Sequence, residues 1–227
     1  MEMAEIDEGR PADEPKLSTK EKILDAAEEL FAERGYYGVS IRQITQHAGV
    51  DLALANYHFG PKEELFRHVI ARRAEEHSHR QMEYLQNAIA AAGDGPPSIE
   101  ALVRAFCEPI FDRTMRGGPG WKHYIQLLSH TANTKQSHGF LAPMNERYDP
   151  VVEAFTDAFK RALPACAPHN VHYAVYFLQG AIVYLLAETG AINRQSHGLV
   201  DASDFDAILE RMVPFFAAGF YALAGRP

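Results

Sequence analysis

The sequence predicts an all-α protein, in which an N-terminal three-helix unit precedes a larger helical domain. Apolar residues recur at intervals of three and four over most of the chain, and no segment alternates apolar and polar residues as a strand does. Clusters of glycine and proline at 93–97, 117–120 and 164–168 divide this pattern into separate helices. The hydrophobic fraction of 47% and the charged fraction of 23% are typical of a soluble globular protein of one or two domains.

The N-terminal part of the chain begins with a segment that does not look helical. Residues 1–16 are acidic, contain two prolines and have few large apolar side chains, so we expect a disordered tail. A helix is predicted over residues 18–34. Ser18 and Glu21 have the spacing of a capping box, in which two side chains satisfy the unpaired N–H groups of a helix start, and Gly35 is suited to end the helix.

Two short helices are predicted next, over residues 40–47 and 51–58. Gly49 lies between them and is suited to end the first helix, because glycine readily adopts the left-handed conformation found at helix ends. Ser40 and Asp51 are suited to cap the starts of the two helices. The residues of this segment expected to point inward are Leu54, Tyr57 and Phe59. Such a pair is either an ordinary corner between two helices or a helix-turn-helix, whose second helix fits the major groove of DNA.

The flanking segments favour the second alternative. The residues that carry this argument are Ile23-Leu24-Asp25-Ala26-Ala27, Leu30-Phe31, Gly35-Tyr36, Ser40-Ile41-Arg42-Gln43-Ile44, Ala48-Gly49-Val50, Tyr57-His58-Phe59 and Lys62-Glu63-Glu64-Leu65. This series resembles the N-terminal domain of the TetR family of transcriptional repressors, without gaps from about residue 18 to residue 66. The resemblance implies a DNA-binding domain over 17–62 and a helical ligand-binding and dimerisation domain over 63–227.

Contacts with DNA bases are expected from the exposed N-terminal side of the second short helix, where Leu52, Ala53 and Asn56 share one face. Asn56 can pair with adenine through two hydrogen bonds, the apolar residues can contact a thymine methyl group, and Arg42 is suited to a guanine. The resemblance implies that these four positions read bases, although Asn56 stands where an aromatic residue is commoner. It also implies that backbone phosphates are contacted by Ser40, Tyr57, His58 and Lys62.

The net charge of −8 is unevenly distributed along the chain. Residues 1–15 hold six acidic residues and one arginine, and residues 74–227 hold sixteen acidic and twelve basic residues. Residues 16–73 hold nine basic and eight acidic residues, so the predicted DNA-binding unit is the one segment that is not acidic. Because phosphate contacts depend on local positive charge, we expect DNA binding with a modest electrostatic contribution.

The rest of the chain is predicted to form six helices separated by the glycine and proline clusters. Their expected ranges are 61–92, 98–115, 121–131, 143–163, 169–191 and 203–224. Pro109 should kink the second of these helices, because proline removes a backbone donor and crowds the preceding turn. Residues 133–140 are expected to form a polar loop.

Aromatic residues are frequent in these helices and have two interpretations: they line a cavity for a hydrophobic small-molecule effector, or they form an ordinary core. The set is Phe106, Phe111, Trp121, Tyr124, Phe155, Phe159, Tyr173, Phe177 and Tyr184. The strings Asn56-Tyr57-His58-Phe59-Gly60 and Met212-Val213-Pro214-Phe215-Phe216-Ala217-Ala218-Gly219 resemble the TetR subgroup that senses fatty acids or acyl-CoA. The cations expected for the anionic end of such an effector are Arg104, Arg113, Arg116 and Lys122.

The last two predicted helices are apolar on nearly every side. In a domain of this size they can bury all their faces only against a second copy of the chain, so we expect a homodimer with a four-helix interface. The expected interface residues are Gly180, Ala181, Phe215, Phe216 and Phe220. Two-fold symmetry would match a palindromic DNA operator.

Other functional classes find little support in the sequence. It has no glycine-rich phosphate loop, nucleophile elbow or metal-binding histidine pair on a helix, so we predict no catalytic residue, cofactor or metal site. Cys107 and Cys166 are expected as buried thiols of a cytoplasmic protein, and no apolar run approaches the ~20 residues of a membrane helix. The expected function is therefore that of a ligand-responsive, homodimeric repressor. The alternatives are a regulator of xenobiotic efflux and, in a different class, a helical lipid carrier or enzyme that uses the helical pair only for packing.

Overall fold

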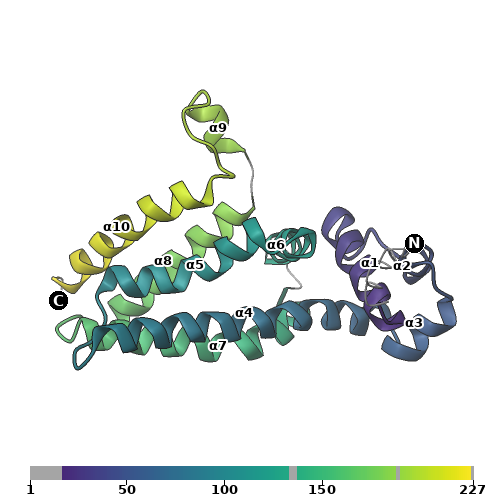
Figure 1. Ribbon diagram of the computed structural model, residues 1–227, viewed down its shortest axis with the longest axis horizontal. Helices are drawn as coiled ribbons and strands as arrows, with labels where there is room; N and C mark the ends of the chain where they lie inside the picture. Colours follow the sequence, from purple (N-terminus) through teal and green to yellow (C-terminus); the bar gives the residue numbers. More distant parts are fainter. Residues whose placement is uncertain (1–16, 133–136, 188–189, 226–227) are drawn as a thin grey trace, which may run out of the picture.

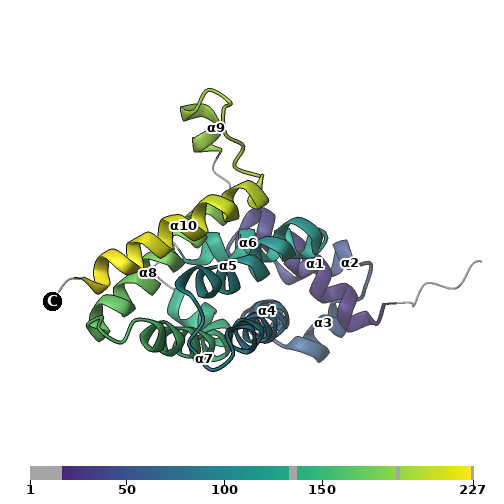
Figure 2. The same cartoon turned by 60° about the vertical axis from the view of Figure 1, so that its left-hand side comes forward.

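The computed structural model describes residues 17–132, 137–187 and 190–225, so the predicted disordered tail lies outside these ranges. The described residues form ten α-helices and no strand, which confirms the all-α fold class. Short helices form a unit at one end of the molecule, and longer helices form a bundle at the other (Figure 1). Figure 2 shows the same arrangement from the side of the bundle, with α9 (Ala191–Gln195) standing away from it.

The N-terminal unit consists of three short helices and the beginning of a fourth, longer helix. These helices are α1 (Thr19–Arg34), α2 (Ile41–Ala48), α3 (Leu52–Phe59) and α4 (Lys62–Ala92). Their apolar faces share one core, in which the rings of Phe31 and Phe66 meet edge to face with centroids 5.0 Å apart. Because this core includes Ile70 of α4 and Leu127 of a later helix, the first packing unit extends past the predicted boundary at residue 62.

The helix α4 connects the two ends of the molecule. Its 31 residues give a length of about 45 Å at a rise of ~1.5 Å per residue. The bundle around its second half is made of α5 (Ile99–Arg116), α6 (Pro119–Ala132), α7 (Ser137–Ala162), α8 (Pro168–Leu186) and α10 (Phe205–Ala224). A second apolar core joins these helices, and α7 runs along α4 in both ribbon views.

Two predicted helix boundaries in the bundle are wrong. The helix α7 begins at Ser137, so residues 137–140 of the predicted polar loop 133–140 are helical and Pro143 lies within the helix, whereas residues 133–136 lie outside the described ranges. The helix α8 ends at Leu186, whereas the prediction continued to residue 191. Gly190 adopts a left-handed conformation (φ 62°, ψ 12°) that starts the separate short helix α9, so the apolar pattern crosses a real break in the backbone.

Pro109 lies inside α5, as the sequence predicts, and its missing N–H removes the helical donor for the carbonyl oxygen of Ala105, four residues earlier. The side-chain amide of Gln81 on α4 donates a hydrogen bond of 2.8 Å to the carbonyl oxygen of Phe106, in the turn before the proline. Gln81 is 1% exposed, so this bond also fixes the position of α4 against α5 inside the bundle.

A buried ion-pair cluster joins the N-terminal unit to the bundle. The carboxylate of Glu28 on α1 is 2% exposed and accepts hydrogen bonds from Arg72 (2.8 Å) and Arg73 (3.0 and 3.1 Å) on α4. Arg72 also contacts Asp25 at 2.7 Å. At Gly120 of α6, even a methyl group would overlap with the Arg73 guanidinium, so this helix packs directly on the cluster. We call Asp25, Glu28, Arg72 and Arg73 the Glu28 cluster.

Candidate functional site

Side-chain caps fix the two helices of the predicted helix-turn-helix. Gly49 has φ 66° and ψ 36°, the left-handed conformation that the sequence predicts for it. The hydroxyl of Ser40 accepts the N–H of Gln43 at 3.3 Å, and the carboxylate of Asp51 accepts the N–H of Ala53 at 2.7 Å. The predicted caps and the predicted turn are therefore confirmed.

The second helix of this motif, α3, has one buried face and one exposed face. Ala55 and Phe59 are its buried residues and lie one turn apart. Leu52, Ala53 and Asn56 are exposed. These three side chains extend away from the core, which is the arrangement that contacts with base edges in a major groove require.

Two of the residues predicted to point inward are exposed instead. Leu54 is 40% exposed and Tyr57 is 83% exposed. The reason is the ~100° rotation per helical residue, which turns Leu54 and Tyr57 about 100° and 200° away from the buried Ala55. The phenol of Tyr57 is therefore accessible to a phosphate, whereas the prediction that Leu54 and Tyr57 belong to the core is wrong.

Arg42 on α2 and His58 on α3 are both exposed to solvent. Arg67 and Arg72 are held by carboxylates at 2.9 and 2.7 Å, but no ion pair within the described residues holds Arg42. Its guanidinium is thus available for a base or a phosphate. Ser40 differs, because its hydroxyl caps α2 and donates to the side-chain oxygen of Gln43 at 2.8 Å, so a phosphate would compete with this internal bond.

Lys62 has a different environment from the one predicted for a phosphate contact. Its ammonium group donates to the carbonyl oxygens of Tyr36 (3.0 Å) and Val39 (2.9 Å) and lies 4.2 Å from the centre of the Tyr36 ring. Burial lowers the pKa of Lys62. Since both carbonyls belong to the connection between α1 and α2, we assign Lys62 a structural role in holding this connection on α4.

Replacing Lys62 by methionine is expected to lower the free energy of unfolding by about 1–2 kcal/mol, because two charge-assisted hydrogen bonds are lost. Urea denaturation measures this loss, and Lys22→Met, at an exposed lysine of α1, is the matched control. The salt dependence of DNA binding should stay unchanged. Unchanged stability together with a salt slope reduced by about one would restore the phosphate contact that the sequence suggests.

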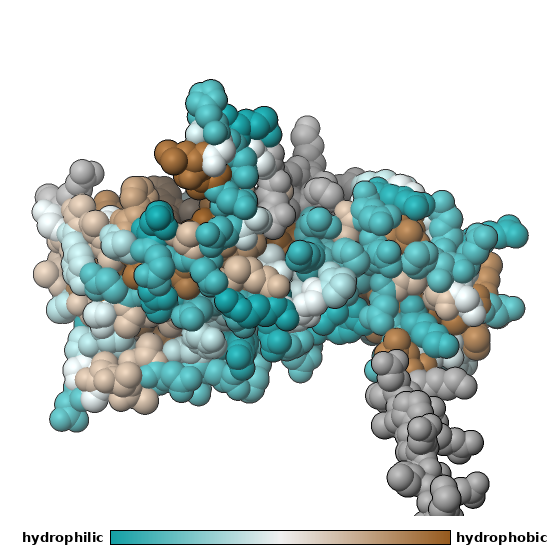
Figure 3. Space-filling view, turned by 45° about the horizontal axis from the view of Figure 1, so that its top comes forward, coloured by the Kyte–Doolittle hydropathy of each residue, from teal (hydrophilic) through white to brown (hydrophobic). Residues whose placement is uncertain are grey.

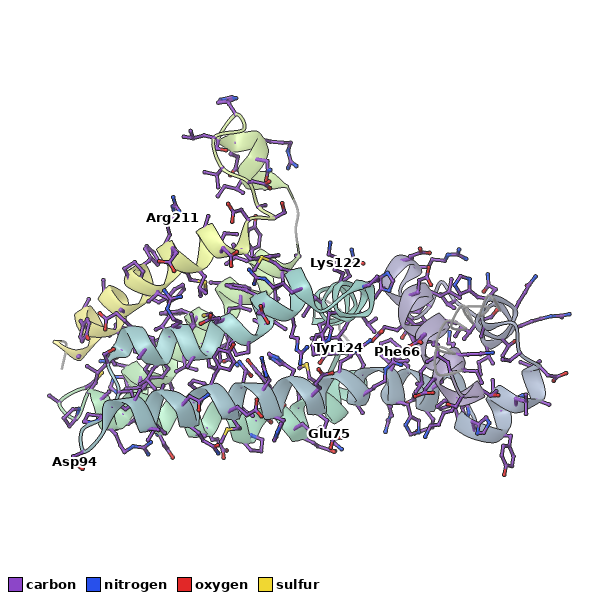
Figure 4. All side chains as sticks on the ribbon, viewed as in Figure 1. Phe66, Glu75, Asp94, Lys122, Tyr124 and Arg211 are labelled. Atoms are coloured by element: carbon purple, nitrogen blue, oxygen red, sulfur yellow. The ribbon has the colours of Figure 1, made fainter. Side chains whose placement is uncertain are left out.

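The bundle contains an apolar cavity of about 120 Å³. Its apolar wall is formed by Ile110, Ile125, Leu128, Met144, Ile182 and Leu186. Its polar lining residues include His77, Ser78 and Gln81 on α4 and Tyr124 on α6. Figure 4 shows Tyr124 between α6 and α4, which places the phenol at the junction of the two helices.

The polar groups that line this cavity are uncharged at neutral pH. Burial, together with the nearby charge of Arg113, lowers the pKa of His77 to about 4, so its imidazole is neutral. Burial raises the pKa of Tyr124 above its usual range and that of Tyr148, which stacks on His77 at 5.9 Å, to about 12. The cavity therefore presents hydrogen-bonding groups without a full charge.

Most of the aromatic residues predicted to line a cavity lie elsewhere, and among them only Tyr124 faces this one. The buried members that belong to the apolar core are Phe106, Phe111, Phe155 and Phe159. The indole of Trp121 lies between the guanidinium groups of Arg73 (5.4 Å) and Arg113 (5.5 Å). The members on the outer side of α8 are Tyr173, Phe177 and Tyr184, which are 56, 56 and 63% exposed. Apolar content could not distinguish the inner from the outer side of α8.

The arginines proposed for an anionic ligand are already paired with carboxylates. Arg104 contacts Glu210 at 2.9 Å, and Arg116 contacts Asp206 at 3.0 Å, so both attach α10 to α5. The third, Arg113, contacts Glu76 at 2.7 Å. Lys122 is exposed at the outer edge of α6 and does not line the apolar cavity (Figure 4). None of these cations is thus in place to receive a carboxylate inside the cavity.

The outer sides of α8 and α10 carry exposed apolar residues, in agreement with the surplus of apolar faces that the sequence shows. The most exposed are Tyr176 (70%), Phe215 (74%), Tyr173, Phe177, Val183, Tyr184 and Tyr221. Figure 3 shows brown, hydrophobic residues interspersed with hydrophilic ones over the side of the bundle that carries α10. Of the predicted interface residues, Gly180 and Phe215 are exposed and Ala181 and Phe216 are half-buried. We call the exposed side chains of both helices the α8–α10 face.

The prediction that Phe220 belongs to the dimer interface is wrong. Phe220 is 1% exposed and its ring stacks on that of Phe159 at 4.3 Å, so it belongs to the core of the bundle.

Among the described helices, α10 alone is long and apolar enough to cross a membrane, a property that core helices of soluble proteins share. Cys107 and Cys166 are buried free thiols, as predicted.

The functional residues that the sequence analysis missed are His77, Ser78 and Gln81. Their spacing on α4 places all three toward one side of the helix, among apolar neighbours, and this was the available signal. No group of three or more histidine, cysteine or acidic side chains in the described part of the chain is placed to hold a metal ion.

Comparisons with known proteins match both parts of the structure. Residues 23–69 match the family model for bacterial regulatory proteins of the tetR family, and residues 104–219 match the model for the tetracyclin repressor-like C-terminal domain. The probable HTH-type transcriptional regulator YttP of Bacillus subtilis is 39% identical over 56 residues, which span 25% of this chain and 27% of that protein. The biofilm operon icaADBC negative transcriptional regulator IcaR of Staphylococcus aureus is 27% identical over 147 residues, which span 62% and 71% of the two chains.

Solved structures with the same fold include two named FadR. The FadR of Bacillus subtilis in complex with stearoyl-CoA superimposes with a TM-score of 0.64 at 17% identity, covering 87% of this chain and 97% of that one. The fatty acid degradation regulator FadR of Bacillus halodurans gives a TM-score of 0.66 at 12% identity, with coverages of 91% and 98%. At these identities the similarity shows the fold.

Proposed function

The chain belongs to the TetR family of bacterial transcriptional regulators, and we propose that it is a homodimeric repressor whose affinity for DNA is controlled by a hydrophobic small molecule. The observation that carries the DNA-binding part is the exposed side of α3 with Leu52, Ala53 and Asn56, together with Arg42 on α2, which is exposed and has no ion pair within the described residues. A lipid carrier or an enzyme would have no use for this arrangement. The relatives are DNA-binding regulators, and we place the protein in the cytoplasm, where its operator would be.

The homodimer is supported by the α8–α10 face. Large apolar surfaces on a soluble monomer usually mark an interface, and a second copy of the same face would cover both helices. We therefore interpret α10 as an interface helix and not as a membrane segment. Two-fold symmetry would place the two α3 helices about one DNA turn apart, ~34–36 Å, on a palindromic operator.

Several chemical classes of effector are compatible with this function. A fatty acid or acyl-CoA is supported by the resemblance of residues 56–60 and 212–219 to lipid-responsive regulators and by the fold shared with FadR. An anionic head group is disfavoured, because carboxylates already form ion pairs with Arg104, Arg113 and Arg116. A regulator of xenobiotic efflux would use the same apolar cavity for a different hydrophobic compound.

Replacing Asn56 by alanine is expected to weaken binding to the specific operator by about 1–3 kcal/mol, because a bidentate contact with one base would be lost. Fluorescence anisotropy with DNA from upstream of the gene measures this change. Asn87→Ala, at an exposed asparagine of α4, is the matched control and should bind like the wild type. If the wild type binds neither this DNA nor pooled genomic fragments at low salt, the proposed function is wrong.

A further inference from the structure

The cavity in the bundle contains a cluster of buried polar atoms that lack a hydrogen-bond partner within the described part of the chain. The atoms are His77 Nδ1, Ser78 Oγ, Gln81 Oε1 and Tyr124 Oη, and their residues are 7, 8, 1 and 0% exposed. More than about 90% of buried polar groups in proteins are paired, since leaving one unpaired costs roughly 1–3 kcal/mol. Four such atoms around one cavity indicate a ligand that completes their hydrogen bonds.

The donors and acceptors in this cluster limit what the ligand can be. Gln81 has committed its amide N–H to the Phe106 carbonyl at 2.8 Å, so its free oxygen only accepts. The hydroxyls of Ser78 and Tyr124 can donate as well as accept. A ligand hydroxyl satisfies both requirements, because it can donate to Gln81 while it accepts from Tyr124 or Ser78.

The charges around the cavity exclude an ionised ligand. Among the residues that the structure describes, no lysine, arginine, aspartate or glutamate lines the cavity, and His77 is neutral because burial lowers its pKa to about 4. The nearby Arg113 is held by Glu76 at 2.7 Å and lies over the Trp121 ring. A carboxylate in this cavity would lose its hydration without gaining a cation, which is strongly unfavourable.

The size of the cavity limits the ligand further. Its volume is about 120 Å³, and an apolar protein cavity of ~150 Å³ is known to bind benzene. The volume of a six-membered ring with one substituent therefore matches the cavity in order of magnitude, whereas the volume of a long acyl chain is several times too large. The apolar wall with Ile110, Leu128 and Ile182 suits the ring, and the α4 side suits the substituent.

We propose that this cavity binds a compact, uncharged molecule that carries a hydroxyl group on an apolar ring, with phenol as the simplest representative. This inference deepens the proposed function, because it names the class of effector that the repressor would recognise. The hydroxyl lies among Ser78, Gln81 and Tyr124, and the ring lies against the aliphatic wall.

Phenol, toluene and benzoate separate the contributions of the hydroxyl, the ring and the charge. Calorimetric titration and thermal melting of the full-length protein should show binding and stabilisation by phenol, weaker binding of toluene and no binding of benzoate. Tyr124→Phe and Ser78→Ala should each weaken phenol binding roughly three- to tenfold and leave toluene binding unchanged. Tyr37→Phe, at a phenol that is 69% exposed in the N-terminal unit, is the matched control.

The variants should fold normally, since each loses only a hydroxyl that has no hydrogen-bond partner among the described residues. Benzoate or oleoyl-CoA binding more tightly than phenol would overturn the inference, as would phenol binding that both variants leave unchanged. Operator binding without any added compound is measured on the same samples. A protein that binds its operator but not phenol retains the proposed function and loses only this inference, whereas a protein that binds no DNA loses the proposed function.

Discussion

Replacing Glu28 by alanine is expected to lower the free energy of unfolding by roughly 3–5 kcal/mol, because it removes one side of a buried ion pair and leaves two guanidinium groups without their shared partner. Glu28 is 2% exposed, and its oxygens lie 2.8–3.1 Å from nitrogens of Arg72 and Arg73. Arg72 retains Asp25 at 2.7 Å, but Arg73 loses its carboxylate hydrogen bonds. Urea denaturation should show a lower midpoint.

The Glu28 cluster lies where α1, α4 and α6 meet, so its loss should also weaken the contact between the N-terminal unit and the bundle. Glu28→Gln keeps the shape of the side chain and removes the charge, so it tests the ion pair separately from packing. Glu29→Ala is the matched control, because the side chain of Glu29 on the same helix is 40% exposed and forms an ion pair with His47 at 3.0 Å. A loss below about 1 kcal/mol in Glu28→Ala would mean that the cluster does not join the two units energetically.

The helix-turn-helix could be predicted closely because its signals are local. Ser18, Ser40 and Asp51 each satisfy N–H groups within three residues along the chain, and Gly49 adopts a conformation that favours glycine wherever it occurs. Helix existence and turn position follow from such short-range interactions. The structural role of Lys62 could not be predicted in this way, because its hydrogen-bond partners lie 23 and 26 residues away along the chain.

The residues that line the cavity could not be predicted, because the lining depends on which sides of several helices meet. Tyr173 and Phe177 have the same apolar character as Phe155 and Phe159, yet the first two face solvent and the second two are fully buried. In contrast, His77 and Gln81 are polar residues that packing turns inward. Apolar periodicity identifies the buried side of a helix only when the opposite side is polar, and α8 and α10 have no polar side.

Replacing Phe215 by aspartate is expected to convert the dimer to a monomer and to abolish operator binding at micromolar protein concentration. Phe215 is 74% exposed in the single chain, so the change does not disturb the core of the bundle. In a dimer built on the α8–α10 face, the same substitution would bury two carboxylates without cations. One half-site would then be bound without its symmetric partner, and the affinity that depends on two linked recognition helices would be lost.

A second substitution tests the close approach of the two α8 helices. A Cβ atom added at Gly180 would have open space around it, and leucine favours a helix more than glycine does. Gly180→Leu should therefore leave the single chain at least as stable, while it weakens the dimer by steric overlap with the partner. Sedimentation equilibrium measures both variants. Leu199→Asp is the control, because Leu199 is 87% exposed and lies outside the α8–α10 face. Sedimentation of the wild type as a monomer, or of Phe215→Asp as a dimer, would contradict this interface.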